Sequence, residues 1–178
     1  MEQRSAKQAG PLGTSWRDRP AGWGGYRNRM TESRSDGAAP HPNLALIDRY
    51  FDMVERGDPE IGSLLTDDVV WRTPQSSPMA GPWVGKAAVL EGMGGGVGLY
   101  AEGTLDLQPA VRAASADHVF VEMKLTATTA GGSPYENDYV FIFVIRDGRI
   151  AEVREHLDTH YAQRVLFDPV GQSSPLDE

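Results

Sequence analysis

The strongest constraint on the fold is a change to a period of two in the second half of the chain. Four segments alternate apolar and polar residues, at about residues 104–114, 118–129, 135–146 and 149–158. The last two are joined by Asp147-Gly148, a pair typical of the two-residue turn of a β-hairpin. The pattern predicts an antiparallel meander of four strands.

The segment before these strands has helical spacing instead. Leu44, Ile47, Phe51 and Val54 recur every three or four residues, between an N-cap at Asn43 and a stop at Gly57. A second, short helix is predicted to begin at Asp58-Pro59.

A short strand is predicted over residues 68–73, with Val69 and Trp71 on one face. A weak helix follows from Lys86 to Met93 and is expected to break at the glycine run 94–96. Helices followed by a meander predict an α+β fold in which the helices pack on one face of the sheet.

The hairpin turn predicts the register of the last two strands. A two-residue loop pairs Val140 with Glu155 and Asp138 with Leu157. The face toward the helices would then contain both carboxylates among apolar residues, namely Met123, Val140 and Val153.

Asp138 and Glu155 are diagonal neighbours in this register, about 7–8 Å apart at the backbone. Two interpretations are open. One carboxylate can lie at the wet rim of the sheet while the other bonds to a helix end. Alternatively, the two form a general acid/base pair in an apolar pocket, where burial raises the pKa of a carboxyl.

The opposite face would hold an aromatic stripe, made of Tyr139, Phe141, Phe143, Ile145 and Ile150. Such a stripe should not stay in water. The prediction is a homodimer through this outer face, and the alternative is coverage by the chain's own C-terminus.

Composition separates the ends from the domain. Residues 1–40 contain one Leu and no Val, Ile or Phe, so a disordered leader is predicted there, and residues 169–178 are predicted to be a flexible tail. Residues 1–40 have a net charge of +3 and residues 41–178 a net charge of −11. An acidic domain disfavours nucleic acid and anionic membranes as partners.

The chain has no cysteine, which excludes thiolate metal sites and a cysteine nucleophile. No apolar run reaches the roughly 20 residues of a membrane span. The expected location is therefore the cytoplasm, and no metal site is expected.

Four segments together resemble the SnoaL-like branch of the nuclear-transport-factor-2-like (NTF2-like) superfamily, over about residues 43–167. They read A-L-I-D-R-Y-F-D-M-V-E-R-G-D at 45–58, L-L-T-D-D-V-V-W at 64–71, W-V-G-K-A-A-V at 83–89 and R-D-G-R-I-A-E-V-R-E-H-L-D-T at 146–159. The resemblance implies a cone of curved sheet closed by helices, a pocket in its mouth and a homodimer.

The superfamily's functional residues match this chain only in part. Tyr50 matches the helix-one tyrosine of ketosteroid isomerases, an oxyanion donor, but their general-base Asp falls near Thr73 and their second Asp near Val140. Glu155 matches a glutamate near the end of the phenazine-biosynthesis PhzA/PhzB-like proteins, whose preceding strand is similar to Y-E-N-D-Y at 135–139.

The sequence thus predicts a cofactor-free acid/base enzyme, a cyclase, isomerase, dehydratase or related condensing enzyme, acting on a small, largely apolar or aromatic metabolite. Glu155 would be the principal acid/base, Asp138 a second carboxyl and Tyr50 a hydrogen-bond donor to an oxyanion. The substrate would be bound by residues of the apolar face, namely Trp71, Trp83, Met123, Val140 and Val153. The alternative is a binding or scaffolding module with a pocket but no turnover.

Overall fold

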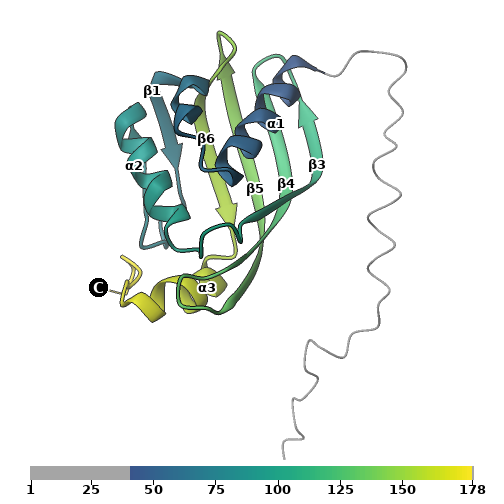
Figure 1. Cartoon of the computed structure of the whole chain (residues 1–178). Helices are drawn as coiled ribbons and strands as arrows, with labels where there is room; N and C mark the ends of the chain where they lie inside the picture. The colour runs from purple at the N-terminus through teal and green to yellow at the C-terminus, as the bar shows by residue number, and fades with distance from the viewer. Residues whose placement is uncertain (1–40, 178) are drawn as a thin grey trace, which may run out of the picture. The chain divides into compact units, whose positions relative to one another are not determined.

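The computed structural model describes residues 41–177, so the predicted leader, residues 1–40, lies outside the described residues. These residues form one curved six-stranded sheet with helices on its concave face (Figure 1). The strand bounds are β1 Leu65–Arg72, β2 Trp83–Val84, β3 Asp106–Ala114, β4 His118–Thr128, β5 Pro134–Arg146 and β6 Arg149–Leu157. The predicted α+β class is confirmed.

The sheet is not purely antiparallel. Its order is β2-β1-β6-β5-β4-β3, and every neighbouring pair is antiparallel except β1 and β6, which run parallel. β3 to β6 form the predicted meander. Because β1 comes before the meander in the chain but pairs with its last strand, residues far apart in sequence meet at the centre of the sheet.

Helix α1 (Pro42–Glu55) covers the concave face with Ile47, Tyr50 and Phe51, all at most 6% exposed. Its N-cap is His41, whose side chain accepts the N–H of Asn43. The Asn43 side chain donates instead to two carbonyls of the β3–β4 turn, which ties the helix to the sheet.

Two shorter helical segments flank the sheet. The 3-10 helix η3 (Pro59–Leu64) begins as predicted at Asp58, whose carboxylate accepts the N–H of Glu60 at 2.9 Å. After β6 the chain continues through α3 (Thr159–Ala162), the π-helix η4 (Gln163–Phe167) and η5 (Asp168–Val170). None of the helices in residues 41–177 combines the length and apolar character of a membrane span.

Helix α2 (Lys86–Val97) continues through the glycine run, so the prediction that it breaks at Gly94 is wrong. Packing explains part of this glycine content. A Cβ at Gly92 would lie 2.5 Å from the Trp83 ring, whereas one at Gly96 would be at an ordinary contact distance, 3.6 Å, from the Met79 methyl group. Glycine at position 92 therefore lets the helix pack directly on an aromatic ring.

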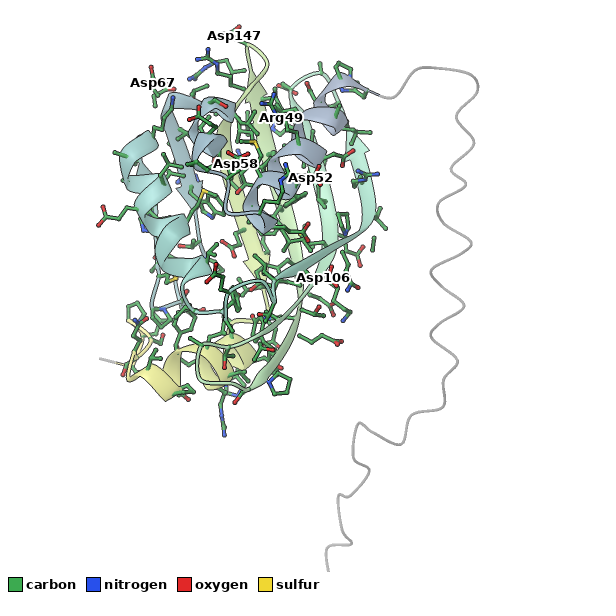
Figure 2. The ribbon with its side chains drawn as sticks, viewed as in Figure 1. Arg49, Asp52, Asp58, Asp67, Asp106 and Asp147 are labelled. Atoms are coloured by element: carbon green, nitrogen blue, oxygen red, sulfur yellow. The ribbon has the colours of Figure 1, made fainter. Side chains whose placement is uncertain are left out.

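The β5–β6 hairpin has the predicted turn but not the predicted register. Asp147, at the tip in Figure 2, has φ 52° and Gly148 has φ 70°, as a type I′ turn requires. One irregularity follows: Ile145 pairs with Ile150, but Val144 then pairs with Glu152, which leaves Ala151 as an extra residue in β6. This bulge moves β6 by one position relative to β5.

The predicted placement of Met123 and Val140 on one face also requires a four-residue loop, residues 130–133, before β5. Thr128 pairs with Pro134 instead, so the β4–β5 loop has five residues, 129–133. The bulge and the loop each change the register of β5 by one residue. Together they place toward the helices the face of β5 that was predicted to be outside. The predicted inner sets of β4 and β6 are correct, including Met123, Val153 and Glu155, whereas the two faces of β5 are exchanged.

Two specific expectations are therefore wrong. Asp138 and Val140 lie on the outer face of the sheet, not beside Glu155. The aromatic stripe (Tyr139, Phe141 and Phe143 with Ile145) faces the helices and is buried, with 0–8% exposure. The alternating B and e pattern of β5 follows directly from this orientation.

Candidate active site

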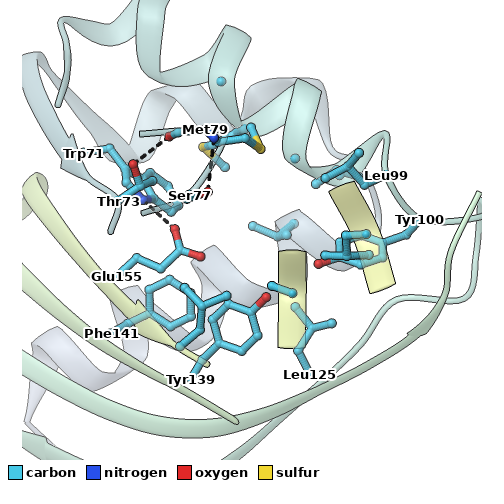
Figure 3. A pocket seen from close by; sticks show the side chains of 18 of the residues that line it. Trp71, Thr73, Ser77, Met79, Leu99, Tyr100, Leu125, Tyr139, Phe141 and Glu155 are labelled. Atoms are coloured by element: carbon cyan, nitrogen blue, oxygen red, sulfur yellow. Dashed lines mark hydrogen bonds between the residues drawn. The ribbon is translucent and has the colours of Figure 1, made fainter. Parts of the chain in front are cut away.

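A cavity of about 140 Å³ lies between the helices and the concave face of the sheet. Its wall is almost entirely apolar and aromatic, with contributions from α1, α2, the loops after β1 and α2, all six strands and the C-terminal helices. Figure 3 shows the few polar groups among these side chains, including Glu155, Thr73, Tyr100 and Tyr139. A cavity of this size holds at least one aromatic ring.

Among residues 41–177, Glu155 is the only carboxylate that borders the cavity. It lies on β6 directly across from Phe141 on β5, and its carboxylate points into the cavity (Figure 3). Burial raises the pKa of Glu155 to about 7, and the hydrogen bond from Trp71 acts in the opposite direction. Burial thus moves the pKa of this carboxyl into the neutral range, where it can both take and give a proton.

Trp71 supplies the hydrogen bond that Glu155 accepts. Its indole Nε1 donates to Glu155 Oε2 at 2.9 Å. The parallel pairing of β1 with β6 places Trp71 beside Val153, and its ring packs edge-on against Phe141 with centroids 6.3 Å apart. Trp83, with its centroid 6.4 Å from that of Trp71, extends the same wall.

Tyr50 reaches the cavity from α1 and is 3% exposed. Within residues 41–177 its hydroxyl has one weak partner, the Met93 sulfur at 3.9 Å. Burial raises the pKa of Tyr50, and the nearby Glu155 charge raises it further. Tyr50 is therefore a neutral hydroxyl whose proton can be donated to a ligand.

The remaining residues expected at the site lie elsewhere. Asp138 is on the outer face, opposite Lys124 on β4 and paired with it at 3.1 Å. Val140 is 41% exposed on the same face. Met123 and Val153 are on the inner face but within the core, at 1% and 0% exposure, and do not border the cavity.

Thr73 occupies the position where the ketosteroid isomerase resemblance places a general base. Its hydroxyl donates to the Met79 carbonyl at 2.7 Å and accepts the Gly81 N–H at 2.6 Å. Both interactions shape the loop of residues 74–82. Thr73 therefore has a structural role at the cavity edge, and a hydroxyl of this kind does not act as a base at neutral pH.

Several wall residues were not expected from the sequence. Tyr139 and Phe141 were assigned to the outer face, so their exchange follows from the β5 register. Leu166 and Phe167, both 5% exposed, close the cavity from the C-terminal helices. The apolar residues of the segment Y-A-Q-R-V-L-F at 161–167 were the sequence signal from which this part of the wall could have been predicted.

Comparison with known proteins agrees with this architecture. The NTF2-like protein of unknown function from Burkholderia pseudomallei has a TM-score of 0.65 at 20% identity, over 72% of this chain and 99% of its own. Bal32a, from a soil-derived mobile gene cassette, has a TM-score of 0.64 at 24% identity, over 70% and 96%. TerC, co-crystallised with polyporic acid, has a TM-score of 0.63 at 23% identity, over 71% and 98%.

At these identities the solved structures show the fold alone. No curated protein matches the chain. The family model for the SnoaL-like domain matches residues 47–153, which include the greater part of α1, Trp71 and most of the sheet. The protein therefore belongs to the SnoaL-like domain family, within the NTF2-like fold.

Proposed function

We propose that the protein is a cofactor-free acid/base enzyme that acts on a small, largely apolar metabolite. The reaction class is a proton transfer at carbon or oxygen, as in an isomerisation, cyclisation, dehydration or related condensation. Glu155 is the group that takes and returns the proton. Trp71 positions its carboxylate, and Tyr50 donates a hydrogen bond to an oxygen that gains charge.

The observation that carries this proposal is the environment of Glu155. A single carboxyl with a pKa of about 7 lies on an apolar cavity wall and is held by one N–H donor. A catalytic acid/base is most effective when its pKa is near the working pH. Burial of an uncompensated carboxylate costs stability, so a purely structural role does not explain this placement.

The dimensions and chemistry of the cavity support the substrate class. Its apolar, aromatic wall suits a ring compound with few polar groups. TerC, which has the same fold, was crystallised with the small organic molecule polyporic acid. We extend to this chain only the inference that the fold can bind a molecule of that general kind.

The second candidate is a ligand-binding module without turnover. It is favoured by Thr73, whose hydroxyl is committed to the loop at the position of the expected general base. In that case Glu155 would be an acceptor or donor for a bound ligand, and no proton would be transferred.

A proton-transfer assay that does not require the natural substrate separates these two candidates. 5-Nitrobenzisoxazole is a flat, apolar C–H acid that opens to a coloured phenolate when a base removes its ring proton. The wild-type protein should accelerate this opening, with a rate that rises through an apparent pKa near 7. Glu155→Gln should lower the rate by about 10²–10⁴-fold.

Glu122→Gln is the matched control, since Glu122 is an exposed carboxylate on the outer face of β4. It should leave the rate unchanged. Equal rates for wild type and Glu155→Gln would reject the catalytic proposal and favour the binding module.

We also propose that the protein is a homodimer in the cytoplasm, with the outer face of the sheet as its interface. The apolar part of that face is the outer patch, formed by Phe120, Val140 and Ile142. Phe120 and Ile142 are direct cross-strand partners, and Phe120 and Val140 are 45% and 41% exposed. This patch takes the place of the aromatic stripe, which is buried.

A further inference from the structure

A chain of hydrogen bonds runs along the inner face of β5 to the cavity. Asn137 Nδ2 donates to the Tyr135 hydroxyl at 2.9 Å, and the Tyr135 and Tyr139 hydroxyls are 3.0 Å apart. The three residues alternate along the strand and are 5%, 2% and 4% exposed in the order Asn137, Tyr135 and Tyr139. The chain is therefore shielded from solvent except at its end beside the cavity.

The first bond of this chain has a fixed direction. Asn137 Oδ1 accepts the N–H of Asp138 at 2.9 Å, which orients the side-chain amide. Its two Nδ2 protons then go to the Tyr135 hydroxyl and to the carbonyl of Asp158, at 2.9 and 3.0 Å. Tyr135 is thus an acceptor from Asn137 and keeps one proton to donate.

The second bond follows from the first. Among the described residues, Tyr139 is the one acceptor within hydrogen-bond distance of the Tyr135 proton. A buried hydroxyl proton without an acceptor is costly. Tyr139 borders the cavity, where a ligand can accept its proton, whereas Tyr135 does not, so we assign Tyr135 as the donor to Tyr139. The Tyr139 proton then has no acceptor within 3.5 Å in residues 41–177, and its nearby hydroxyl neighbour is Tyr100, on whose pKa Tyr139 has a lowering effect that is smaller than the raising effect of burial.

The free end of the chain faces the cavity. Figure 3 shows the Tyr139 hydroxyl directed toward its centre, as is the hydroxyl of Tyr100. The ring of Tyr100 packs 5.7 Å from that of Tyr135, and backbone bonds of residues 99 and 101 tie this segment to the β4–β5 loop. Two phenolic hydroxyls are thus directed into the cavity from one part of a largely apolar wall.

We propose that the Tyr139 hydroxyl, with Tyr100 beside it, binds an acceptor oxygen of the ligand. Asn137 and Tyr135 are positioning residues that orient and polarise the Tyr139 donor. The ligand class is an apolar ring compound with a carbonyl or similar oxygen. This inference rests on the proposed function for its choice of cavity, but binding does not require turnover.

The location relative to Glu155 restricts the ligand further. Phe141 lies directly across from Glu155, and Tyr139 is two residues away on the same face, opposite Leu157. Diagonal neighbours of this kind are about 7–8 Å apart at the backbone. The acceptor oxygen and the proton that Glu155 exchanges therefore belong to the same small molecule, a few bonds apart.

The ionisation of the two cavity tyrosines agrees with a donor role. Burial raises the pKa of Tyr139, and neighbouring tyrosines and Glu155 add to the effect. Burial, Tyr135 and Glu155 likewise raise the pKa of Tyr100, while its interaction with Tyr139 acts in the opposite direction. Both remain protonated throughout the neutral range, so they can donate but do not act as bases.

The test compares 1-indanone, labelled with ¹³C at its carbonyl, with indane, which has the same ring system and no oxygen. Wild-type protein should bind indanone about 3- to 10-fold more tightly than indane, as expected for one neutral hydrogen bond. The infrared C=O stretch of bound indanone should lie at a lower frequency than that of indanone in an apolar solvent without a hydrogen-bond donor. Equal affinities, an unshifted band or no binding of indanone would each overturn the proposal.

Variants identify the donor. Tyr139→Phe keeps the ring that stacks on Phe141 at 5.6 Å and should abolish most of the frequency shift and of the preference for indanone. Tyr135→Phe should reduce the shift in part, because it removes only the polarising bond. A full shift in both variants would overturn the proposal.

Two further variants serve as controls. Tyr161→Phe alters a ring that stacks on Tyr135 at 5.5 Å but whose hydroxyl is not in the chain, and should leave the shift unchanged. Glu155→Gln should also retain the shift. If the protein fails the proton-transfer assay but shifts the indanone band, the enzyme proposal is rejected and the oxygen-binding role is kept. If it passes the assay but does not shift the band, only the oxygen-binding role is rejected.

Discussion

Trp71 and Glu155 form a hydrogen bond across two parallel strands, with 2.9 Å between the indole Nε1 and the carboxylate Oε2. The bond stabilises the ionised form of a carboxyl that burial otherwise disfavours. The pKa of Glu155 is therefore the result of two opposed effects, of which burial is the larger.

Replacement of Trp71 by Phe should shift this pKa upward, because the opposing effect is removed while burial stays. An NMR titration of the ¹³C-labelled Glu155 carboxyl should give a midpoint above 7. Trp83→Phe is the matched control, since Trp83 is also a wall residue but does not bond to Glu155. An unchanged midpoint in Trp71→Phe would contradict this account.

Glu155 should also make the stability of the protein depend on pH. Its folded-state pKa of about 7 lies above the ordinary value of 4.5, so the folded state binds the proton more tightly than the unfolded state. The free energy of unfolding should therefore fall as pH rises from about 4.5 to 7 and be constant outside this window, as far as this group is concerned.

Glu155→Gln removes this dependence. Below pH 4.5 the variant and the wild type should be about equally stable, and above pH 7 the variant should be more stable by up to about 3 kcal/mol. Urea denaturation at a series of pH values measures the difference. Parallel curves for the two proteins would show that the carboxyl is solvated in the folded state.

Two glycines of α2 should respond to alanine in opposite ways. A Cβ at Gly92 would meet the Trp83 ring at 2.5 Å, so Gly92→Ala should destabilise the protein by about 1–3 kcal/mol. Gly94 has open space around it, and Gly94→Ala should stabilise the helix by up to about 1 kcal/mol. Thermal denaturation of both variants is the measurement, and equal effects would refute the assigned packing.

The outer patch provides a test of oligomeric state. Ile142→Glu should convert a dimer to a monomer in sedimentation experiments, because it puts a charge between Phe120 and Arg154, the cross-strand partners of Ile142. Val170→Glu is the control, at a 55% exposed apolar residue outside the sheet. A dimer that survives Ile142→Glu would place the interface elsewhere.

The sequence allowed five of the six strands (all but β2), the hairpin turn and the inner faces of β4 and β6 to be predicted. The faces of β4 and β6 were predictable because each of these strands has one clearly apolar side. β5 is apolar on both sides, with Phe141 and Phe143 on one and Val140 and Ile142 on the other. Its orientation depended on the register, and a bulge at Ala151 has no distinctive sequence signal. Glu155 was therefore placed correctly, while Asp138 and Tyr139 were exchanged.

The strand order has a consequence for synthesis of the protein. β6 is the last strand to leave the ribosome, yet it lies between β1 and β5. Until it is available, β1 and β5 each have an unpaired edge, and such edges can pair with other chains. Long-range pairing of this kind is also slow. A chain released at Gly148 would thus present two separate sheet fragments with unpaired edges, and protection from aggregation depends on the presence of β6.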